Sequence, residues 1–139
     1  MYQSILLAVD GSNHSIRAAR EAIKVAAFNK ESKLTVVYVA DHNNAKTEVL
    51  HSNSTEELDL ARRKRLQPIE EALATNGVDY VVKILHGTPG PAIVEFANDG
   101  DFDMLIIGSR GLNALQEMVL GSVSHKVIKR VDCPVLVVK

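Results

Sequence analysis

The residues best suited to chemistry lie in two short clusters of glycine and serine. The first, "GSRG", runs from Gly108 to Gly111, and nine residues later Gly121 and Ser122 form the second. Glycine lets a ligand approach the backbone closely, and serine adds a hydroxyl beside exposed backbone N–H groups. A helix that begins at Gly121, Ser122 and Val123 would offer unpaired N–H groups and the positive end of its dipole to a phosphate. The two clusters therefore predict a phosphate site.

Side chains beside these glycines could add to the site, although a simpler interpretation also exists. Ser122 and Ser124 could donate hydrogen bonds to phosphate oxygens, and Arg110 could add positive charge. In the simpler interpretation, Gly108 and Gly111 only make a tight turn and Ser122 only caps a helix. A lone pair of glycines would favour that interpretation, because short motifs often match by chance. The complete two-part arrangement favours phosphate binding.

Other chemistry-bearing residues show no pattern of a metal or redox site. The five histidines lack the spacing of metal ligands, and Cys133 is the only cysteine, so it cannot form an internal disulfide. The run "DGDFD", residues 99–103, is similar to the start of a calcium loop. However, Met104 stands where that loop needs glycine, and Arg110 where it needs a bidentate glutamate. We predict no metal site made by the protein alone.

The charge pattern argues against nucleic acid and membrane partners. The chain has 16 Lys and Arg against 17 Asp and Glu, a formal net charge of −1, so its summed field attracts neither polyanions nor an anionic bilayer surface. The basic run "RRKR", residues 62–65, lies in a helical pattern with Asp59 four residues before Arg63, and no aromatic residues interleave it. We interpret this run as a solvated helix face.

Five short apolar segments, mostly β-branched, alternate with four helical patterns. The expected strands are residues 5–10, 33–40, 79–85, 104–109 and 134–139. One expected helix starts after an N-cap at Ser12, Asn13 or Ser15, and another starts at Thr88 and Pro89. The other two expected helices span 55–76 and 122–130. This alternation predicts a single α/β domain, residues 1–139, with an open five-stranded parallel sheet and helices on both faces. In such sheets, ligands bind outside the carboxyl ends of the strands.

The two-part glycine pattern and its surroundings resemble the nucleotide-binding signature of the universal stress protein family. "ILLAVDGSNHSIRAAREAIKVA" is similar to that family's opening strand and helix, and "DFDMLIIGSRG" and "LGSVSHKVIKRVDCPVLVVK" to its closing half. The resemblance implies a Rossmann-like fold, of the adenine nucleotide alpha hydrolase-like kind, with strand order 3-2-1-4-5. It also implies homodimers paired through the last strand and, in members that keep these glycines, ATP bound in the crevice.

The resemblance further implies a role for each matching residue. Ala8, Val9 and Asp10 would flank the adenosine, and Val39 would meet the adenine from the end of the second strand. Ile107 and Gly108 would lie along the ribose. The residues around the phosphates would be Ser109, Arg110, Gly111, Gly121, Ser122 and Val123. None of the motif glycines is replaced, and position 110 varies among basic residues in the family.

Asp10 has two interpretations from the residues alone. It ends a strand at the expected ligand edge, where its carboxylate could accept from a ribose hydroxyl or an adenine amino group, or help hold Mg²⁺ brought by the phosphates. Alternatively, it could bond its own turn, "DGS", in an Asx arrangement. The residues leave these two interpretations even, and the resemblance favours the ligand.

Rapid hydrolysis of ATP is not indicated. The P-loop pattern G-x-x-x-x-G-K-[ST] is absent, so we expect no lysine at the β and γ phosphates. Neither an arginine finger nor a water-orienting glutamine is indicated, and phosphoryl transfer depends on such positioned groups. We therefore predict ATP binding with little or no hydrolysis and assign no catalytic residue.

The expected protein is a cytoplasmic, ATP-binding homodimer that acts in stress response or signalling. The start "MYQSILLAVDGS" has no positive region, and Asp10 interrupts its apolar stretch, so we expect neither a signal peptide nor a membrane span. An apolar last strand, from about Val135 to Lys139, would invite pairing with a second copy if it lies at the sheet edge. Alternatives are a slow adenine-nucleotide hydrolase and a nucleotide-free interaction module. A flavodoxin-like FMN protein is less favoured, because its phosphate would follow the first strand and the chain lacks tryptophan.

Overall fold

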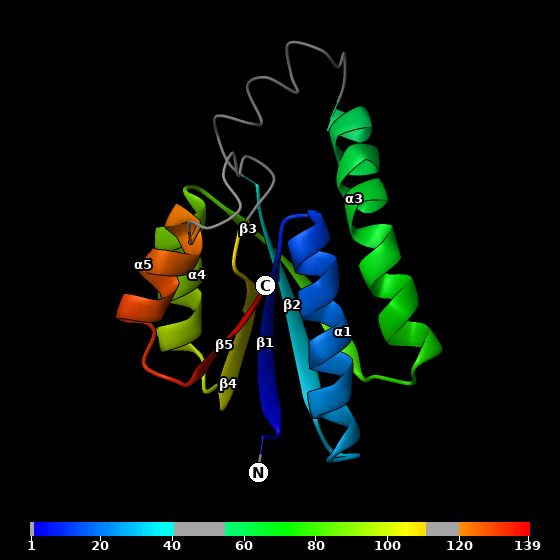
Figure 1. Ribbon diagram of the computed structural model, residues 1–139. Helices are drawn as coiled ribbons and strands as arrows, with labels where there is room; N and C mark the ends of the chain where they lie inside the picture. The colour runs from blue at the N-terminus through cyan, green and yellow to red at the C-terminus, as the bar shows by residue number, and fades with distance from the viewer. Residues whose placement is uncertain (1, 41–54, 111–119) are drawn as a thin grey trace.

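The computed structural model describes residues 2–40, 55–110 and 120–139, without the side chains of residues 55–59. Strands and helices alternate along the chain (Figure 1). The strands are β1 (Ser4–Val9), β2 (Lys33–Ala40), β3 (Tyr80–His86), β4 (Met104–Gly108) and β5 (Val135–Val138). The helices are α1 (Asn13–Ala27), α3 (Thr55–Thr75), α4 (Pro89–Asp99) and α5 (Ser122–Arg130). The expected boundaries of the strands, and those of the helices at 55–76 and 122–130, agree with these to within one residue.

All five strands are parallel, and their order is β3-β2-β1-β4-β5, as the family resemblance implied. β1 is central and pairs with both β2 and β4, so the winding of the chain reverses between β1 and β4. The register sets Val9 beside Tyr38 and Ala8 beside Ile107. The carboxyl ends of the three central strands therefore end at one level, next to each other.

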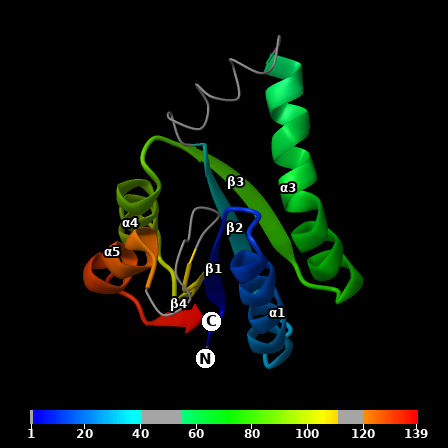
Figure 2. The same ribbon diagram turned by 45° about the horizontal axis from the view of Figure 1, so that its top comes forward.

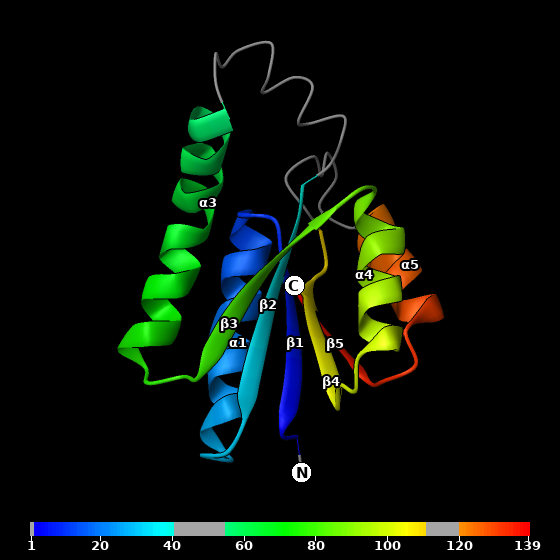
Figure 3. The ribbon, with the colours of Figure 1, turned by 180° about the vertical axis from the view of Figure 1, so that it is seen from behind.

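Helices cover both faces of the sheet, which explains why the strands are apolar throughout. α1 and α3 lie on one face, and α4 and α5 lie on the other (Figure 1 and Figure 3). Side chains alternate along β1, so Ile5 and Leu7 pack under α1 and α3 while Leu6 packs under α4 and α5. All three are fully buried. A strand buried on both sides has no polar face, and this gives the near-continuous apolar runs of the sequence.

Asp103, the last residue of the rejected calcium-like run, closes the amino-terminal edge of the sheet. Its Oδ2 accepts hydrogen bonds from the backbone N–H groups of Gln3 (3.0 Å) and Ser4 (2.9 Å). These two bonds favour the ionised carboxylate and hold the pKa of Asp103 below its ordinary value. The acidic run therefore anchors the start of β1 beside the start of β4, far from the ligand edge.

Helix termini follow the predicted signals in part. Ser12 is the N-cap of α1, and its side chain accepts a hydrogen bond from the N–H of Ser15. Thr88 stands at the N-cap position of α4 before Pro89, as expected, but its hydroxyl makes no capping hydrogen bond. None of the helices, over the residues that the structure describes, is both long and apolar enough to span a bilayer.

Candidate functional site

A pocket of about 440 Å³ lies at the carboxyl ends of the central strands. Its wall combines the ends of β1, β2 and β4 with the N-terminal parts of α4 and α5 and with one residue each of α1 and α3. Figure 2 brings this edge of the sheet forward, with α1 and α3 on one side of β1 and α4 and α5 on the other. The volume lies within the range of pockets that hold a small organic ligand. The pocket therefore occupies the place where a ligand is expected in an open α/β sheet.

Most of the predicted site residues lie in the wall of this pocket. They are Ala8, Val9, Asp10, Val39, Ile107, Gly108, Arg110, Gly121, Ser122, Val123 and Ser124. Gly111 falls outside the described residues. Ser109 acts through its backbone: its N–H donates to the carbonyl of Val138 (2.7 Å), and its carbonyl accepts from the N–H of Gly121 (2.8 Å). The structure thus brings together residues that are more than a hundred positions apart in the sequence.

Two hydrogen bonds join the first glycine and serine cluster to the start of α5. One is the bond from the Gly121 N–H to the Ser109 carbonyl, and the other runs from the Ser124 hydroxyl to the Gly108 carbonyl at 2.6 Å. Ser124 is the third residue of α5, is only 3% exposed and faces β4. Its hydroxyl therefore donates to a backbone carbonyl, whereas we expected it to donate to a phosphate oxygen. Ser124 fixes the start of α5 against the end of β4.

The start of α5 is open toward the ligand. Gly121 is the N-cap and has an extended backbone (φ −62°, ψ 153°), and among the described residues no side chain makes a capping bond there. Ser122 follows with an exposed side chain. The first N–H groups of a helix have no partner within the helix, and its dipole makes this end positive. The open end of α5 is therefore suited to an anion.

Gly108 is a glycine for a reason that the sequence did not reveal. A Cβ atom at this position would lie 2.8 Å from the Cβ of His14 and 2.9 Å from the His14 carbonyl carbon. The first turn of α1 therefore packs directly on the end of β4. Closeness to a ligand was the predicted reason, but contact with α1 already excludes a side chain.

The loop between β1 and α1 makes several hydrogen bonds within itself. Asp10 Oδ1 accepts from the N–H of Ser12 (2.9 Å), and Ser12 Oγ accepts from the N–H of Ser15 (3.2 Å). Ser15 Oγ accepts from the N–H of Gly11 (3.1 Å) and donates to the carbonyl of Ser12 (2.9 Å). Asp10 thus makes the Asx turn that was one of its two interpretations, and it also lies in the pocket wall.

His14 links this loop to the first glycine and serine cluster. Its Nε2 lies 3.3 Å from Nη2 of Arg110. A guanidinium only donates, so this contact requires an unprotonated Nε2. Burial, followed by the positive charges of Arg17 and Arg110, holds the pKa of His14 below its ordinary value of 6.5, although Asp10 opposes this. Near neutral pH, His14 is therefore a neutral acceptor that positions Arg110 at the pocket.

Arg65 of α3 is a wall residue that the sequence interpretation missed. Its Nη1 donates to the hydroxyl of Tyr38 (2.8 Å), and its Cβ lies 3.1 Å from where Gly11 would carry a Cβ. We interpreted "RRKR" as a solvated helix face, and for Arg65 that was wrong. The helical spacing held the signal: Arg65 lies four residues before the buried Ile69 and so shares its inward face.

Lys126 is a second missed residue of the wall, together with the start of α4. We expected no lysine near a nucleotide's phosphates because the P-loop motif is absent, yet Lys126 of α5 lines the same pocket. The other wall residues that sequence reasoning did not assign to the ligand are Ser15, Tyr38, Thr88, Pro89, Gly90, Pro91 and Ile93. A motif reports residues close in sequence, whereas Lys126 arrives through the packing of α5 on α4.

No protein-made metal centre is evident in the part of the chain that the structure describes. Within those residues, no three His, Cys, Asp or Glu side chains come together as metal ligands. The pocket wall contains the carboxylate of Asp10 and the cations of Arg65, Arg110 and Lys126. Its charged side chains are thus mostly positive, which favours an anionic ligand.

Comparison with known proteins identifies the family. The family model of the Universal stress protein family matches residues 1–139. Universal stress protein MJ0531 of Methanocaldococcus jannaschii is 32% identical, over all of this chain and 83% of that protein. The solved structure of hypothetical protein MJ0577 superposes with a TM-score of 0.83 at 31% identity and covers 100% of this chain and 96% of that one. A universal stress protein in complex with cAMP superposes with a TM-score of 0.70 at 28% identity, over 99% and 96% of the two chains. The chain belongs to the universal stress protein family.

Proposed function

We propose that this chain binds ATP in the pocket at the carboxyl ends of β1, β2 and β4. The adenosine lies against Ala8, Val9, Asp10 and Val39, and the phosphates meet the start of α5. One observation carries the proposal: hydrogen bonds fix Gly121 and Ser124 to the end of β4 while the N-terminus of α5 opens onto the pocket. An open helix start of this kind is a ready phosphate site.

The charges around the pocket support a nucleotide with several phosphates. Arg110 and Lys126 lie in the wall beside the first turn of α5, and both are cations at neutral pH. Asp10, also in the wall, is the nearest candidate to share Mg²⁺ with the phosphates. The relative solved with cAMP carries an adenine nucleotide, which supports the choice of adenine.

The bound nucleotide acts as a signal and is turned over slowly or not at all. Phosphoryl transfer requires groups that orient the attacking water and neutralise the charge that develops on the γ-phosphate. Neither the motifs of the chain nor the described wall residues supply a recognised set of such groups. ATP then favours one arrangement of the protein, as expected of a stress-response or signalling component of the cytoplasm.

The functional unit is a homodimer that pairs through β5. This strand lies at the sheet edge, where it pairs only with β4 among the described strands. Its four residues, Val135–Val138, are all apolar and half-buried. An unpaired apolar edge invites association with another copy. Sedimentation velocity of the purified chain at micromolar concentration tests this, and a monomer with and without ATP contradicts it.

Two measurements test nucleotide binding directly. The purified protein is denatured and the supernatant is analysed for released nucleotide by mass spectrometry. Calorimetric titration of nucleotide-free protein with ATP and Mg²⁺ follows, and we expect saturable binding at one site per chain. If no adenine nucleotide is released or bound, the proposal fails and the alternative of a nucleotide-free interaction module is favoured. Phosphate release well above that of a Ser122→Ala, Arg110→Ala control supports a slow hydrolase instead.

A further inference from the structure

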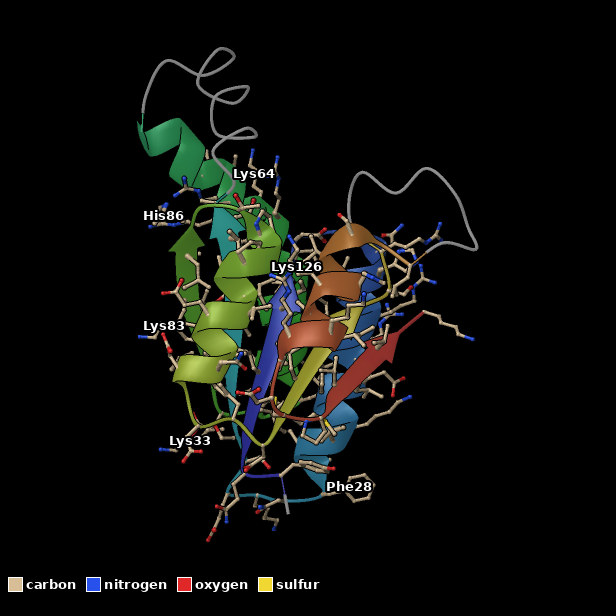
Figure 4. The ribbon with its side chains drawn as sticks, turned by 90° about the vertical axis from the view of Figure 1, so that its left-hand side faces the viewer. Phe28, Lys33, Lys64, Lys83, His86 and Lys126 are labelled. Atoms are coloured by element: carbon tan, nitrogen blue, oxygen red, sulfur yellow. The ribbon has the colours of Figure 1, made fainter. Side chains whose placement is uncertain are left out.

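Lys126 projects into the seam between α4 and α5. It is the fifth residue of α5, one helical turn beyond Ser122, and so lies on the same side of the helix. Figure 4 shows the Lys126 side chain between these two helices. Side chains of a helix tilt toward its N-terminus, which here is the end at the pocket. Lys126 accordingly forms part of the pocket wall.

Gly90 of α4 provides the space for the lysine stem. A Cβ atom on Gly90 would lie 3.0 Å from Cδ of Lys126 and 3.7 Å from its Cβ and Cγ. Gly90 is buried in the first turn of α4, between Pro89 and Pro91. The missing side chain at position 90 leaves room for the Lys126 methylenes to cross α4 toward the pocket.

The Lys126 ammonium has no protein partner among the residues that the structure describes. No hydrogen bond or ion pair of Lys126 is found within those residues. Arg65 and Arg110, the other cations of the wall, contact Tyr38 and His14. The ammonium of this half-buried lysine of the pocket wall is therefore available to a ligand.

We propose that Lys126 is a specificity-determining residue of the nucleotide site, which pairs with the phosphate chain and selects nucleotides by their phosphate charge. This inference rests on the proposed function, since it needs a nucleotide in the pocket. A cation gains more from a ligand with more negative charge, whereas an uncharged nucleoside gains nothing from it. The preference of the site for ATP over ADP, AMP and adenosine therefore depends on Lys126.

Calorimetric titration of the full chain with adenosine, AMP, ADP and ATP, each with Mg²⁺, tests the role of Lys126. Lys126→Met keeps an unbranched stem over Gly90 and removes the charge. We expect about a tenfold loss of ATP affinity, a smaller loss for AMP and an unchanged affinity for adenosine. Lys129→Met is the matched control, because Lys129 is exposed on the same helix outside the pocket wall, and it leaves all four affinities unchanged.

The outcomes separate this inference from the proposed function. A Lys126→Met protein that keeps the ATP affinity of the wild type overturns the inference alone. Equal losses for adenosine and ATP overturn it as well, because they indicate a packing effect. Wild-type protein that binds none of the four ligands overturns the proposed function and this inference with it.

A second variant tests how the lysine is positioned. Gly90→Ala places a methyl group against the Lys126 stem, which must move aside because the contact of 3.0 Å is too close. We expect a severalfold loss of ATP affinity in the wild-type background and no further loss in the Lys126→Met background. An equal loss in both backgrounds contradicts the coupling between Gly90 and Lys126.

Discussion

Helices α1 and α5 begin at the same edge of the sheet with similar residues, yet a side chain caps only the start of α1 among the described residues. Each has a serine as its third residue, Ser15 in α1 and Ser124 in α5, and both serines are buried. The Ser15 hydroxyl bonds within its own loop, whereas the Ser124 hydroxyl reaches across to the Gly108 carbonyl of β4. The start of α1 is therefore capped by a side chain of its own loop. The start of α5 is held against the sheet, and no described side chain caps it.

This difference shows that glycine and serine alone do not make a phosphate site. Both "VDGS" at the end of the first strand and "GSVS" at the start of α5 contain glycine followed by serine. In the first, Asp10 and Ser12 already accept from two backbone N–H groups that a phosphate could use, those of Ser12 and Ser15. A flavodoxin-like phosphate site after the first strand is disfavoured for this reason, and the strand order also differs from that of flavodoxin.

A charged capping side chain at the start of α5 should have the largest effect on ATP affinity. In Gly121→Asp, the carboxylate caps α5 and repels the phosphates, so we expect at least about a hundredfold loss of ATP affinity. The extended backbone at Gly121 accommodates aspartate, so the free energy of unfolding should stay equal or rise by a few tenths of a kcal/mol. Calorimetry and urea denaturation measure the two quantities.

Gly121→Asn separates charge from shape in this experiment. Asparagine caps a helix as well as aspartate does but carries no charge, so its loss of ATP affinity should be clearly smaller. An aspartate variant that binds ATP like the wild type would show that the phosphates lie elsewhere.

The second prediction concerns the contact between the first turn of α1 and the end of β4. In Gly108→Ala, the new methyl group meets backbone and Cβ atoms of His14, so α1 must shift from β4, and we expect a loss of about 2 kcal/mol in the free energy of unfolding. Gly90→Ala is the control, because its new methyl group meets only a flexible lysine stem. The stabilities of the two variants are compared by their urea midpoints, provided that the slope of unfolding free energy against urea concentration is unchanged. Similar midpoints for the two variants contradict the close packing of α1 on β4.

Removing the cap of α1 should affect stability and spare binding. Ser12→Ala removes the acceptor of the Ser15 N–H, which costs about 1 kcal/mol of folding free energy. The ATP affinity measured by calorimetry should remain within about twofold, a small change on the free-energy scale. A large loss of affinity in folded Ser12→Ala protein would place the phosphates at α1 and reverse the comparison.

The smallest effect is a dependence of stability on pH through His14. Its pKa is lowered in the folded protein, so below the ordinary value of 6.5 the unfolded chain binds a proton more readily. The contribution of His14 to stability is fully present above pH 6.5 and is lost as the pH falls through the lower folded pKa. Urea midpoints measured between pH 8 and 5.5 should fall less for His14→Gln than for the wild type. Parallel curves contradict the assigned environment of His14.

The fold could be predicted almost completely because its signals are local. Strands covered on both faces read as apolar runs, and Ser12 and Gly121 mark helix starts in the sequence itself. The family motif placed most of the pocket wall. Arg65 and Lys126 were not predicted as wall residues, because their positions depend on how α3 contacts the β1–α1 loop and how α5 packs on α4. The acceptor of Ser124 and the neighbour of Gly108 are likewise contacts between elements, and no short pattern encodes them.

The peptide groups around Ser109 join the sheet edge to the start of α5. The Ser109 N–H bonds the last residue of β5, and the Ser109 carbonyl holds the N–H of Gly121. A second copy that pairs with β5 and a phosphate that binds at α5 would therefore act on the same short stretch of backbone. If pairing shifts that stretch, equilibrium linkage makes the effect reciprocal: dimerisation and nucleotide binding strengthen or weaken each other by the same factor.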